Sequence, residues 1–282
     1  MKISVITINY NNLEGLRKTM KSVFAQSCRS FEYIVVDGGS TDGGAELIKI
    51  NASYIDKWVS EQDGGIYNAM NKGVKMASGD YCLFLNSGDV FHDDEVMHKV
   101  LQTPFNADIV FGRVDNVLDG KVQKHYVPED KITLMHIYET GLHHAGSFIR
   151  TDLMKKYPYN ENLKICSDRE FFIRTLVVDN ATFQNLPFVV CDFEVGGVSN
   201  NLELVRKESY KILSSIFPPR VTADYVATNL RLKDLTRRMV KVRSKIVKLV
   251  CGVDILLLKL FKLILGPKFY VKDPLKDLKK DE

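Results

Sequence analysis

MKISVITINYNNLEGLRKTMKSVFAQ, residues 1–26, decides the class of fold. Four apolar β-branched residues within residues 3–8 make a short run that predicts a buried strand, and the polar NYNN of residues 9–12 ends it. Apolar residues then recur at helical spacing over residues 13–24. The stretch therefore predicts a strand, a polar loop and a helix, in that order.

The same order of elements recurs further along the chain. FEYIVVD, GGSTDGG and AELIKI follow one another in residues 31–50, and DYCLFLN, SGDVFHDD and EVMHKVL do so in residues 80–101. A shorter predicted strand at residues 57–60 precedes the helical GIYNAMNKGVKMA of residues 65–77. Such alternation is typical of a parallel sheet with helices on both faces. The predicted fold class is α/β.

From about residue 105 the pattern changes to shorter predicted strands with one helix among them. No linker rich in Pro, Gly or Ser separates this part from the first, so we expect one domain over residues 1–200. Residues 201–282 are predicted to be a helical tail. The predicted elements of the second half are strands at Asp108–Phe111, Gly146–Ile149 and Phe188–Phe193 and a helix at residues 167–178.

Charge is distributed unevenly along the chain. Residues 1–200 carry 20 Lys and Arg against 26 Asp and Glu, whereas residues 201–282 carry 19 against 9. A basic tail on an acidic body indicates an anionic partner for the tail, such as a membrane surface or nucleic acid. The five cysteines are dispersed with no CxxC pair, and the N-terminal apolar run is too short for a signal peptide. We therefore expect a cytoplasmic protein with reduced thiols.

Three carboxylates follow predicted strands directly. In sheets of this kind, ligands bind outside the carboxyl ends of the strands. The loops expected there are residues 7–12, 37–41, 61–64 and 86–89, and the last three contain Asp37, Asp63 and Asp89. Because neighbouring carboxylates repel one another and are costly to bury, a cation or a set of ligand donors is expected among them.

Five motifs carry a resemblance to a known family. They are VITINYNN, VVDGGSTDGG, EQDGGIYNAMNKGVKMASGDYCLFLNSGD, HHAGSFIR and SDREFFIR, in that order. In order and spacing, the chain resembles the family 2 glycosyltransferases with the GT-A fold, especially the bacterial enzymes that assemble capsule, O-antigen and exopolysaccharide repeat units. The resemblance covers residues 2–195. It implies a Rossmann-like sheet with a nucleotide-binding half at residues 1–104 and an acceptor half at residues 105–200.

The resemblance also implies a reaction. A sugar hydroxyl attacks the anomeric carbon of a nucleotide-linked sugar, a nucleoside diphosphate leaves, and the anomeric configuration inverts. Such a site needs a general base and a cation that takes up charge on the diphosphate. A UDP-sugar is the favoured donor, with a lipid-linked saccharide or polysaccharide as acceptor.

The metal ligand implied by the family is Asp89, which would hold Mg²⁺ or Mn²⁺ against the diphosphate. Gly88 stands where the usual pattern has a first acid. Mg²⁺ often takes only one or two protein carboxylates, so Asp89 alone is compatible with metal binding. The alternative is that Asp89 only caps the helix that follows.

Several residues match family positions on the donor. Asp37 matches an acid that contacts the nucleoside, Asp63 matches one that reads the uracil edge, and Lys72 would aim at a phosphate. A turn former at Asp37 and a solvated surface lysine at Lys72 are the alternatives. The remaining residues predicted to bind the donor are Thr7, Asn9, Tyr10, Asn86 and Ser87.

Asp168 is the predicted catalytic base, with Glu170 as the second choice. An Asp in the first turn of a helix is also what helix N-termini prefer, which is the structural alternative. His144 matches a family histidine beside the diphosphate and acceptor, whereas His143 is expected to point away. No third His or Cys stands at a ligand spacing, so the pair does not indicate zinc.

The tail contains a predicted amphipathic helix over about residues 241–265. Its lysines at 241, 245, 248, 259 and 262 fall within an arc of about 100°, opposite a broad apolar face. Its central charges disfavour a spanning helix. The pattern favours peripheral binding to anionic lipid on the inner face of the cell membrane over nucleic acid. Packing of this face on the catalytic domain, or on a second copy in a homodimer, is the alternative.

Two other functions remain to be separated from glycosyl transfer. A sugar nucleotidyltransferase would need a Gly- and Arg-rich phosphate loop after the first strand, which NYNNLEG lacks. An inactive membrane scaffold with the same fold is made plausible by Gly88. A Rossmann dehydrogenase is disfavoured because DGGSTDGG is not GxGxxG and follows the second strand.

Overall fold

The computed structural model describes residues 1–118, 120–195, 201–232 and 234–239. Its first half alternates strands and helices as predicted. The strands are β1 (Ile3–Asn9), β2 (Glu32–Asp37), β3 (Lys57–Ser60) and β4 (Tyr81–Phe84). The helices are α1 (Leu13–Phe24), α2 (Gly44–Ile50), the 3-10 turn η1 (Ala52–Tyr54) and α3 (Ile66–Met76).

The second half adds more strands to the same sheet. They are β5 (Val90–Phe91), β6 (Ile109–Leu118), β7 (Lys121–Tyr126), β8 (Ser147–Arg150) and β9 (Phe183–Glu194). The helical segments are α4 (Val96–Gln102), α5 (Leu134–Thr140), η2 (His144–Gly146), α6 (Thr151–Lys156), α7 (Ser167–Phe172), η3 (Ile173–Val178) and α8 (Leu202–Ile216).

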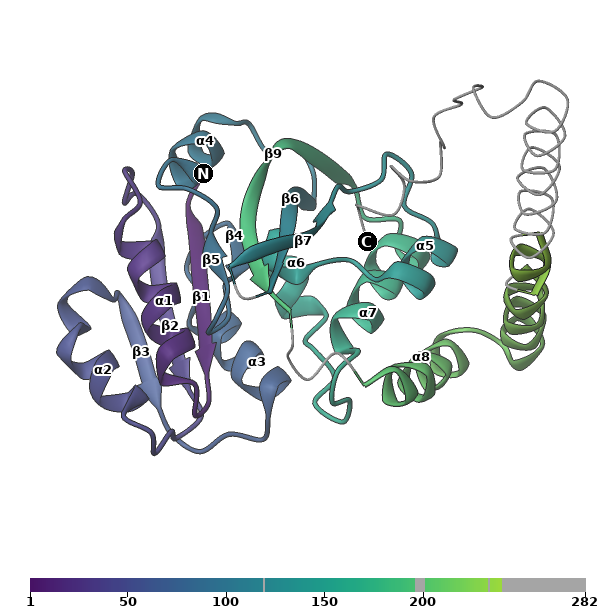
Figure 1. Cartoon of the computed structure of the whole chain (residues 1–282), viewed down its shortest axis with the longest axis horizontal. Coiled ribbons are helices and arrows are strands. Elements are labelled where there is room, and N and C mark those ends of the chain that lie inside the picture. The colour runs from purple at the N-terminus through teal and green to yellow at the C-terminus, as the bar shows by residue number, and fades with distance from the viewer. Residues whose placement is uncertain (119, 196–200, 233, 240–282) are drawn as a thin grey trace, which may run out of the picture. The chain divides into compact units, whose positions relative to one another are not determined.

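Within the described residues, nine strands form one mixed sheet in the order β3-β2-β1-β4-β8-β6-β9-β5, with β7 beside β6 (Figure 1). The strands β1 to β4 are mutually parallel, and β6 is parallel to β9. Strand β8 separates these two groups and is antiparallel to both of its neighbours. The strands of both groups therefore run in one direction, which confirms the predicted α/β class with a mostly parallel sheet.

Two strands are longer than the sequence predicted. Strand β6 continues to Leu118 and pairs with β7, and β9 begins at Phe183. The additional residues of β6 include Arg113, Asp115 and Asn116, which break the apolar pattern that the prediction relied on. Backbone pairing with β7 and β9, rather than a continuous apolar run, keeps them extended.

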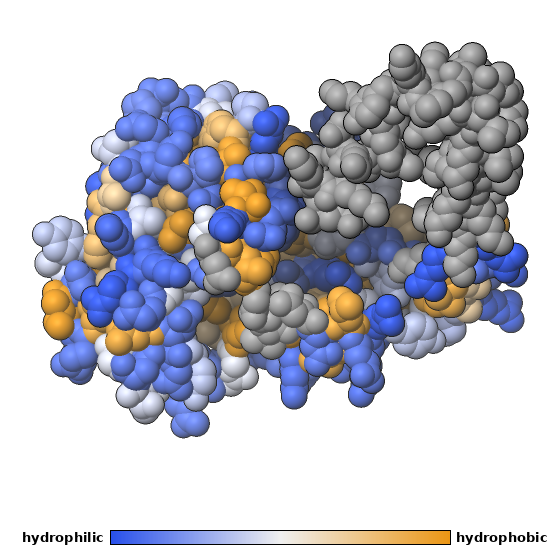
Figure 2. All heavy atoms as spheres, viewed as in Figure 1, coloured by the Kyte–Doolittle hydropathy of each residue, from blue (hydrophilic) through white to orange (hydrophobic). Residues whose placement is uncertain are grey.

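Helices cover both faces of the sheet. One apolar core joins β1, β2 and β4 to buried side chains of α1, α2 and α4. Helix α3 packs on the other face, against β1 and β2, and buries Met70 and Val74 there. On the face of Met1–Ile216 in Figure 2, hydrophilic residues predominate and hydrophobic ones form separate small groups. Burial of the apolar core between these helices and the sheet is the main driving force for folding.

The chain divides into two compact units, Met1–Ile216 and Phe217–Glu282. The first unit extends beyond residue 200, where the sequence predicted the catalytic domain to end, because α8 packs on α7. The buried carboxylate of Glu208 on α8 accepts hydrogen bonds from three successive backbone amides, Lys164, Ile165 and Cys166, at 2.7, 3.1 and 3.0 Å.

In the second unit, residues 219–232 and 234–239 are helical. The predicted amphipathic helix at 241–265 lies outside the described residues. Among the residues that are described, no helix combines the length and hydropathy needed to cross a bilayer.

Candidate active site

The carboxyl ends of the first three strands bring polar residues into register. Asn9 pairs with Asp37 across β1 and β2, and Asp37 pairs with Ser60 across β2 and β3. On the other side of β1, the Ser87 hydroxyl donates to Asn9 Oδ1 at 2.9 Å. The loops predicted to gather at this edge therefore do so.

Asp37 is fully buried, and both of its carboxylate oxygens accept hydrogen bonds from the protein. Oδ1 accepts from Ser40 Oγ at 2.6 Å and from Asn9 Nδ2 at 2.8 Å, while Oδ2 accepts from Ser60 Oγ at 2.7 Å. Burial by itself would raise the pKa of Asp37, but the bonds from Ser40, Ser60 and Asn9 lower it overall. In this structure Asp37 holds three loops together, and its predicted nucleoside contact would need one of these donors to be exchanged.

Beside Asp37, Tyr10 and Asp63 flank Gly38. A Cβ on Gly38 would lie 2.6 Å from Asp63 Oδ2 and 3.1 Å from the ring of Tyr10, so only glycine leaves both side chains in place. The Tyr10 ring is 66% exposed, and Asp63 Oδ1 accepts from the Gly65 amide at 2.8 Å. The arrangement offers an aromatic face and a carboxylate oxygen at one exposed position, which suits a nucleobase.

Two residues predicted to bind the donor are engaged elsewhere. Thr7 is fully buried, and its hydroxyl donates to the Leu85 carbonyl at 2.8 Å and accepts from Tyr33 Oη at 3.1 Å. The structure thus gives Thr7 a core hydrogen bond in place of the predicted donor contact. Lys72 Nζ lies 2.8 Å from Glu61 Oε1, and its contact with a phosphate stays a prediction.

Thr19 of helix α1 hydrogen-bonds to the turn that follows β4. The Thr19 hydroxyl donates to the Asp89 carbonyl at 2.7 Å and accepts from the Gly88 amide at 3.0 Å. Gly88 has φ of 112°, in the region that favours glycine. An acid at position 88 would therefore strain the turn in this conformation.

Asp89 is 4% exposed, and its Oδ1 accepts from the Glu194 amide at 3.3 Å. Burial raises the pKa of Asp89 to about 7, although His144 and two backbone amides lower it. In the same turn, Asn86 Oδ1 is buried without a hydrogen-bond partner among the described residues. A carboxylate and an amide oxygen are ligands that Mg²⁺ and Mn²⁺ accept, so these residues fit the implied cation.

His144 joins this turn to the predicted base. Its Nε2 lies 3.0 Å from Asn86 Nδ2, and its Nδ1 lies 3.6 Å from Asp168 Oδ2. Burial would lower the pKa of His144, but Asp168 and Asp89 raise it overall. Tyr67 Oη donates to Asp168 Oδ1 at 3.4 Å. The structure therefore connects Tyr67, Asp168, His144 and Asn86 in one line of polar contacts.

Glu170, the second choice for the base, and His143, which was expected to point away, have other contacts. Glu170 is buried, and its carboxylate accepts from Arg174 at 2.8 Å and from Asn160 at 2.9 Å, so it is a structural anchor. His143 packs between the rings of Tyr126 and Phe193, at 4.8 and 5.2 Å between centroids. Burial lowers the pKa of His143 to about 4, so it is neutral at physiological pH.

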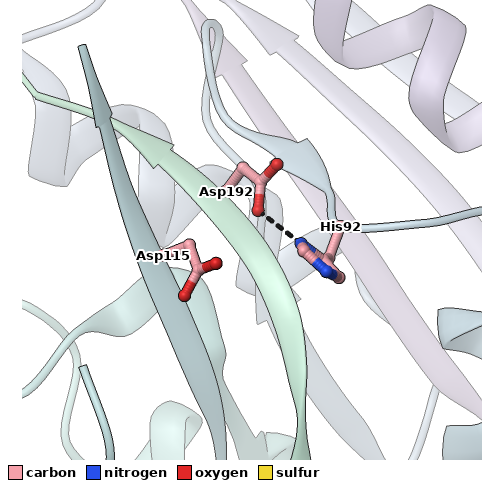
Figure 3. Close-up of side chains that lie close together, drawn as sticks. All are labelled: His92, Asp115 and Asp192. Carbon is pink, nitrogen blue, oxygen red and sulfur yellow. Dashed lines mark hydrogen bonds and ion pairs between the residues drawn. The ribbon is translucent and has the colours of Figure 1, made fainter. Parts of the chain in front are cut away.

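A second cluster lies on the part of the sheet formed by β6 and β9. His92 Nδ1 is 2.7 Å from Asp192 Oδ1, and Asp115 stands beside them (Figure 3). One ligand atom from each of the three residues lies within 4.8 Å of the others, and Asp115 Oδ1 also contacts His125 Nδ1 at 2.7 Å. Sequence reasoning missed this cluster because its members are separated by long stretches of chain.

Sequence reasoning also missed Ser40, Ser60 and Glu194. Ser60 ends a predicted strand, so the rule that pointed to Asp37 would also have found it. Glu194 ends β9, but nothing in the sequence indicated that β9 runs beside β5, next to the turn that carries Asp89.

The chain is similar to known glycosyltransferases in sequence and in fold. The family model for glycosyl transferase family 2 matches residues 4–175. An uncharacterized glycosyltransferase of Mycobacterium tuberculosis is 33% identical over 217 residues, covering 71% of this chain and 78% of its own. A PGL/p-HBAD biosynthesis glycosyltransferase of Mycobacterium bovis is 28% identical over 218 residues, covering 74% and 83%.

Two solved structures share the fold. S. aureus TarS 1–349 in complex with UDP-GlcNAc has a TM-score of 0.60 at 20% identity, covering 79% of this chain and 69% of that chain. Mannosyltransferase PcManGT from Pyrobaculum calidifontis, in complex with GDP-Man and Mn²⁺, has a TM-score of 0.50 at 14% identity, covering 82% and 79%.

Proposed function

This chain belongs to glycosyl transferase family 2, and we propose that it transfers a sugar from a UDP-linked donor to an acceptor hydroxyl with inversion. One observation carries the proposal. The predicted base Asp168 is connected through His144 to Asn86, in the turn that holds Asp89. Base and diphosphate site would thus lie on opposite sides of one imidazole.

The chemistry follows from that arrangement. As the acceptor oxygen bonds to the anomeric carbon, the bond from that carbon to the diphosphate oxygen breaks, and Asp168 takes the acceptor proton. His144 and Tyr67 orient the Asp168 carboxylate from two sides. Asp89 and the Asn86 turn would hold Mg²⁺ or Mn²⁺, which when bound takes up negative charge on the leaving diphosphate. A single displacement of this kind inverts the anomeric carbon.

The choice of UDP rests on the nucleoside end of the site. Asp63 presents a carboxylate oxygen beside the Tyr10 ring, and a carboxylate accepts well from the imide N–H of uracil. The complex of TarS with UDP-GlcNAc supports this choice, and the complex of PcManGT with GDP-Man and Mn²⁺ supports a divalent cation.

We also propose a lipid-linked or polysaccharide acceptor in cell-surface glycan biosynthesis, at the inner face of the cell membrane. The relative that is named for PGL/p-HBAD biosynthesis supports a role in glycan or glycolipid assembly. Membrane attachment rests on the lysine stripe of residues 241–265, which lie outside the described residues.

The test is a donor screen with purified full-length protein. UDP-, GDP- and dTDP-sugars are supplied with Mn²⁺, and release of the nucleoside diphosphate is measured. We expect turnover with a UDP-sugar, and we expect Asp168→Asn to keep UDP affinity while lowering turnover by about 10²–10⁴-fold. Absence of turnover with every donor would favour the inactive scaffold. Wild-type turnover by Asp168→Asn would remove Asp168 from the role of base.

A further inference from the structure

Glu194 ends β9 beside the turn that carries Asp89. Its backbone amide donates to Asp89 Oδ1 at 3.3 Å, although the two residues are 105 positions apart. A side chain built on Gly88 would start 3.8 Å from Glu194 Cβ. Glu194 therefore stands next to the place that a side chain at position 88 would occupy.

The carboxylates of Asp89 and Glu194 also interact through their charges. The like charges of these two side chains repel each other across the turn. A cation that lies between two neighbouring carboxylates offsets the repulsion between them. The two differ in access, because Asp89 is buried while the Glu194 side chain is 43% exposed.

We propose that Glu194 is a second carboxylate ligand of the divalent cation, in partnership with Asp89. This inference rests on the proposed function. Position 88 cannot carry a carboxylate without backbone strain, whereas β9 brings one to the same turn from a distant part of the chain. In the same turn, within the part of the chain that the structure describes, Asn86 Oδ1 is buried without a hydrogen-bond partner and offers the cation a further oxygen ligand.

Lys18 balances the charge of Glu194 when no cation is bound. Lys18 Nζ lies 3.2 Å from Glu194 Oε2, and the lysine side chain is 59% exposed. An ion pair this exposed contributes little, so its exchange for a divalent cation costs little. The pair therefore leaves the Glu194 carboxylate available to a cation.

The test measures Mn²⁺ binding directly, by electron paramagnetic resonance of free Mn²⁺, in full-length protein with and without UDP. Only Mn²⁺ that binds when UDP is present is counted, which separates this site from the cluster of His92, Asp115 and Asp192. We expect Glu194→Gln to weaken this Mn²⁺ binding by about tenfold or more, while leaving UDP affinity in EDTA undiminished.

Two further variants make the outcome decisive. Glu46→Gln removes an acid from the comparably exposed Lys49–Glu46 pair on α2 and should leave Mn²⁺ binding unchanged. Asp89→Asn should abolish UDP-dependent Mn²⁺ binding. If Asp89→Asn abolishes it but Glu194→Gln binds like wild type, the inference about Glu194 is wrong and the proposed function stands. If both variants bind Mn²⁺ like wild type, the proposed metal site at Asp89 and the inference about Glu194 are both wrong.

Discussion

Replacing Asp89 by Asn should stabilise the fold while removing the metal site. Burial raises the pKa of Asp89 from 3.8 to about 7. A carboxyl whose pKa is higher in the folded than in the unfolded state favours folding when neutral. Its contribution is complete below pH 3.8 and is lost as the pH rises towards 7. Asn resembles the neutral acid in size, and its Oδ1 can still accept from the Glu194 amide.

The expected size follows from the shift. One pKa unit corresponds to about 1.4 kcal/mol. At pH 8 the buried carboxylate is ionised and costs the folded state about 4 kcal/mol, whereas at pH 5 the neutral acid is buried and the cost is about 2 kcal/mol. The Asn variant should therefore gain more stability at pH 8 than at pH 5, by about 2.5 kcal/mol.

Urea denaturation in EDTA, followed by fluorescence of Trp58 on β3, measures this difference. Glu46→Gln, at an exposed carboxylate, should show no such dependence on pH. Adding Mn²⁺ and UDP should stabilise wild type more than the Asn variant, because only wild type binds the cation that offsets the buried charge. An equal gain at both pH values, or no gain, would refute the argument that Asp89 is a buried and poorly compensated acid.

The other predictions concern the nucleoside and the core. Asp63→Ala should weaken UDP binding by about 1–3 kcal/mol, with or without Mn²⁺, because the variant leaves a hydrogen-bond donor of the base unpaired. Calorimetry measures this affinity, and an unchanged value would show that Asp63 does not contact the nucleoside. Burial would raise the pKa of Glu32, but Lys57, Ser4 and Ser78 lower it to about 2. Its stabilisation is complete above pH 4.5 and is lost as the pH falls towards 2, so Glu32→Gln should cost about 2–3 kcal/mol at pH 7 and much less at pH 2.5. An equal cost at both pH values would show that the negative charge of Glu32 does not stabilise the fold.

The sequence by itself determined the α/β class and the edge of the sheet where the site lies. Apolar periodicity is a local signal, and so is a carboxylate placed directly after a strand. These signals, together with the family motifs, are enough to single out Asp37, Asp63, Asp89 and Asp168. The structure places His144 Nδ1 3.6 Å from Asp168 Oδ2.

Only the tertiary structure decided what each of these residues touches. The local sequence pattern around Thr7 and Asp37 does not distinguish them from the other residues predicted to bind the donor. In the structure, the Thr7 hydroxyl donates to a backbone carbonyl in the core, and the Asp37 carboxylate accepts hydrogen bonds from several segments of the chain. The partnership of Glu194 with the Asp89 turn spans 105 residues. Contacts at such separation depend on strand order and register, which cooperative packing of the whole sheet sets and no local pattern encodes.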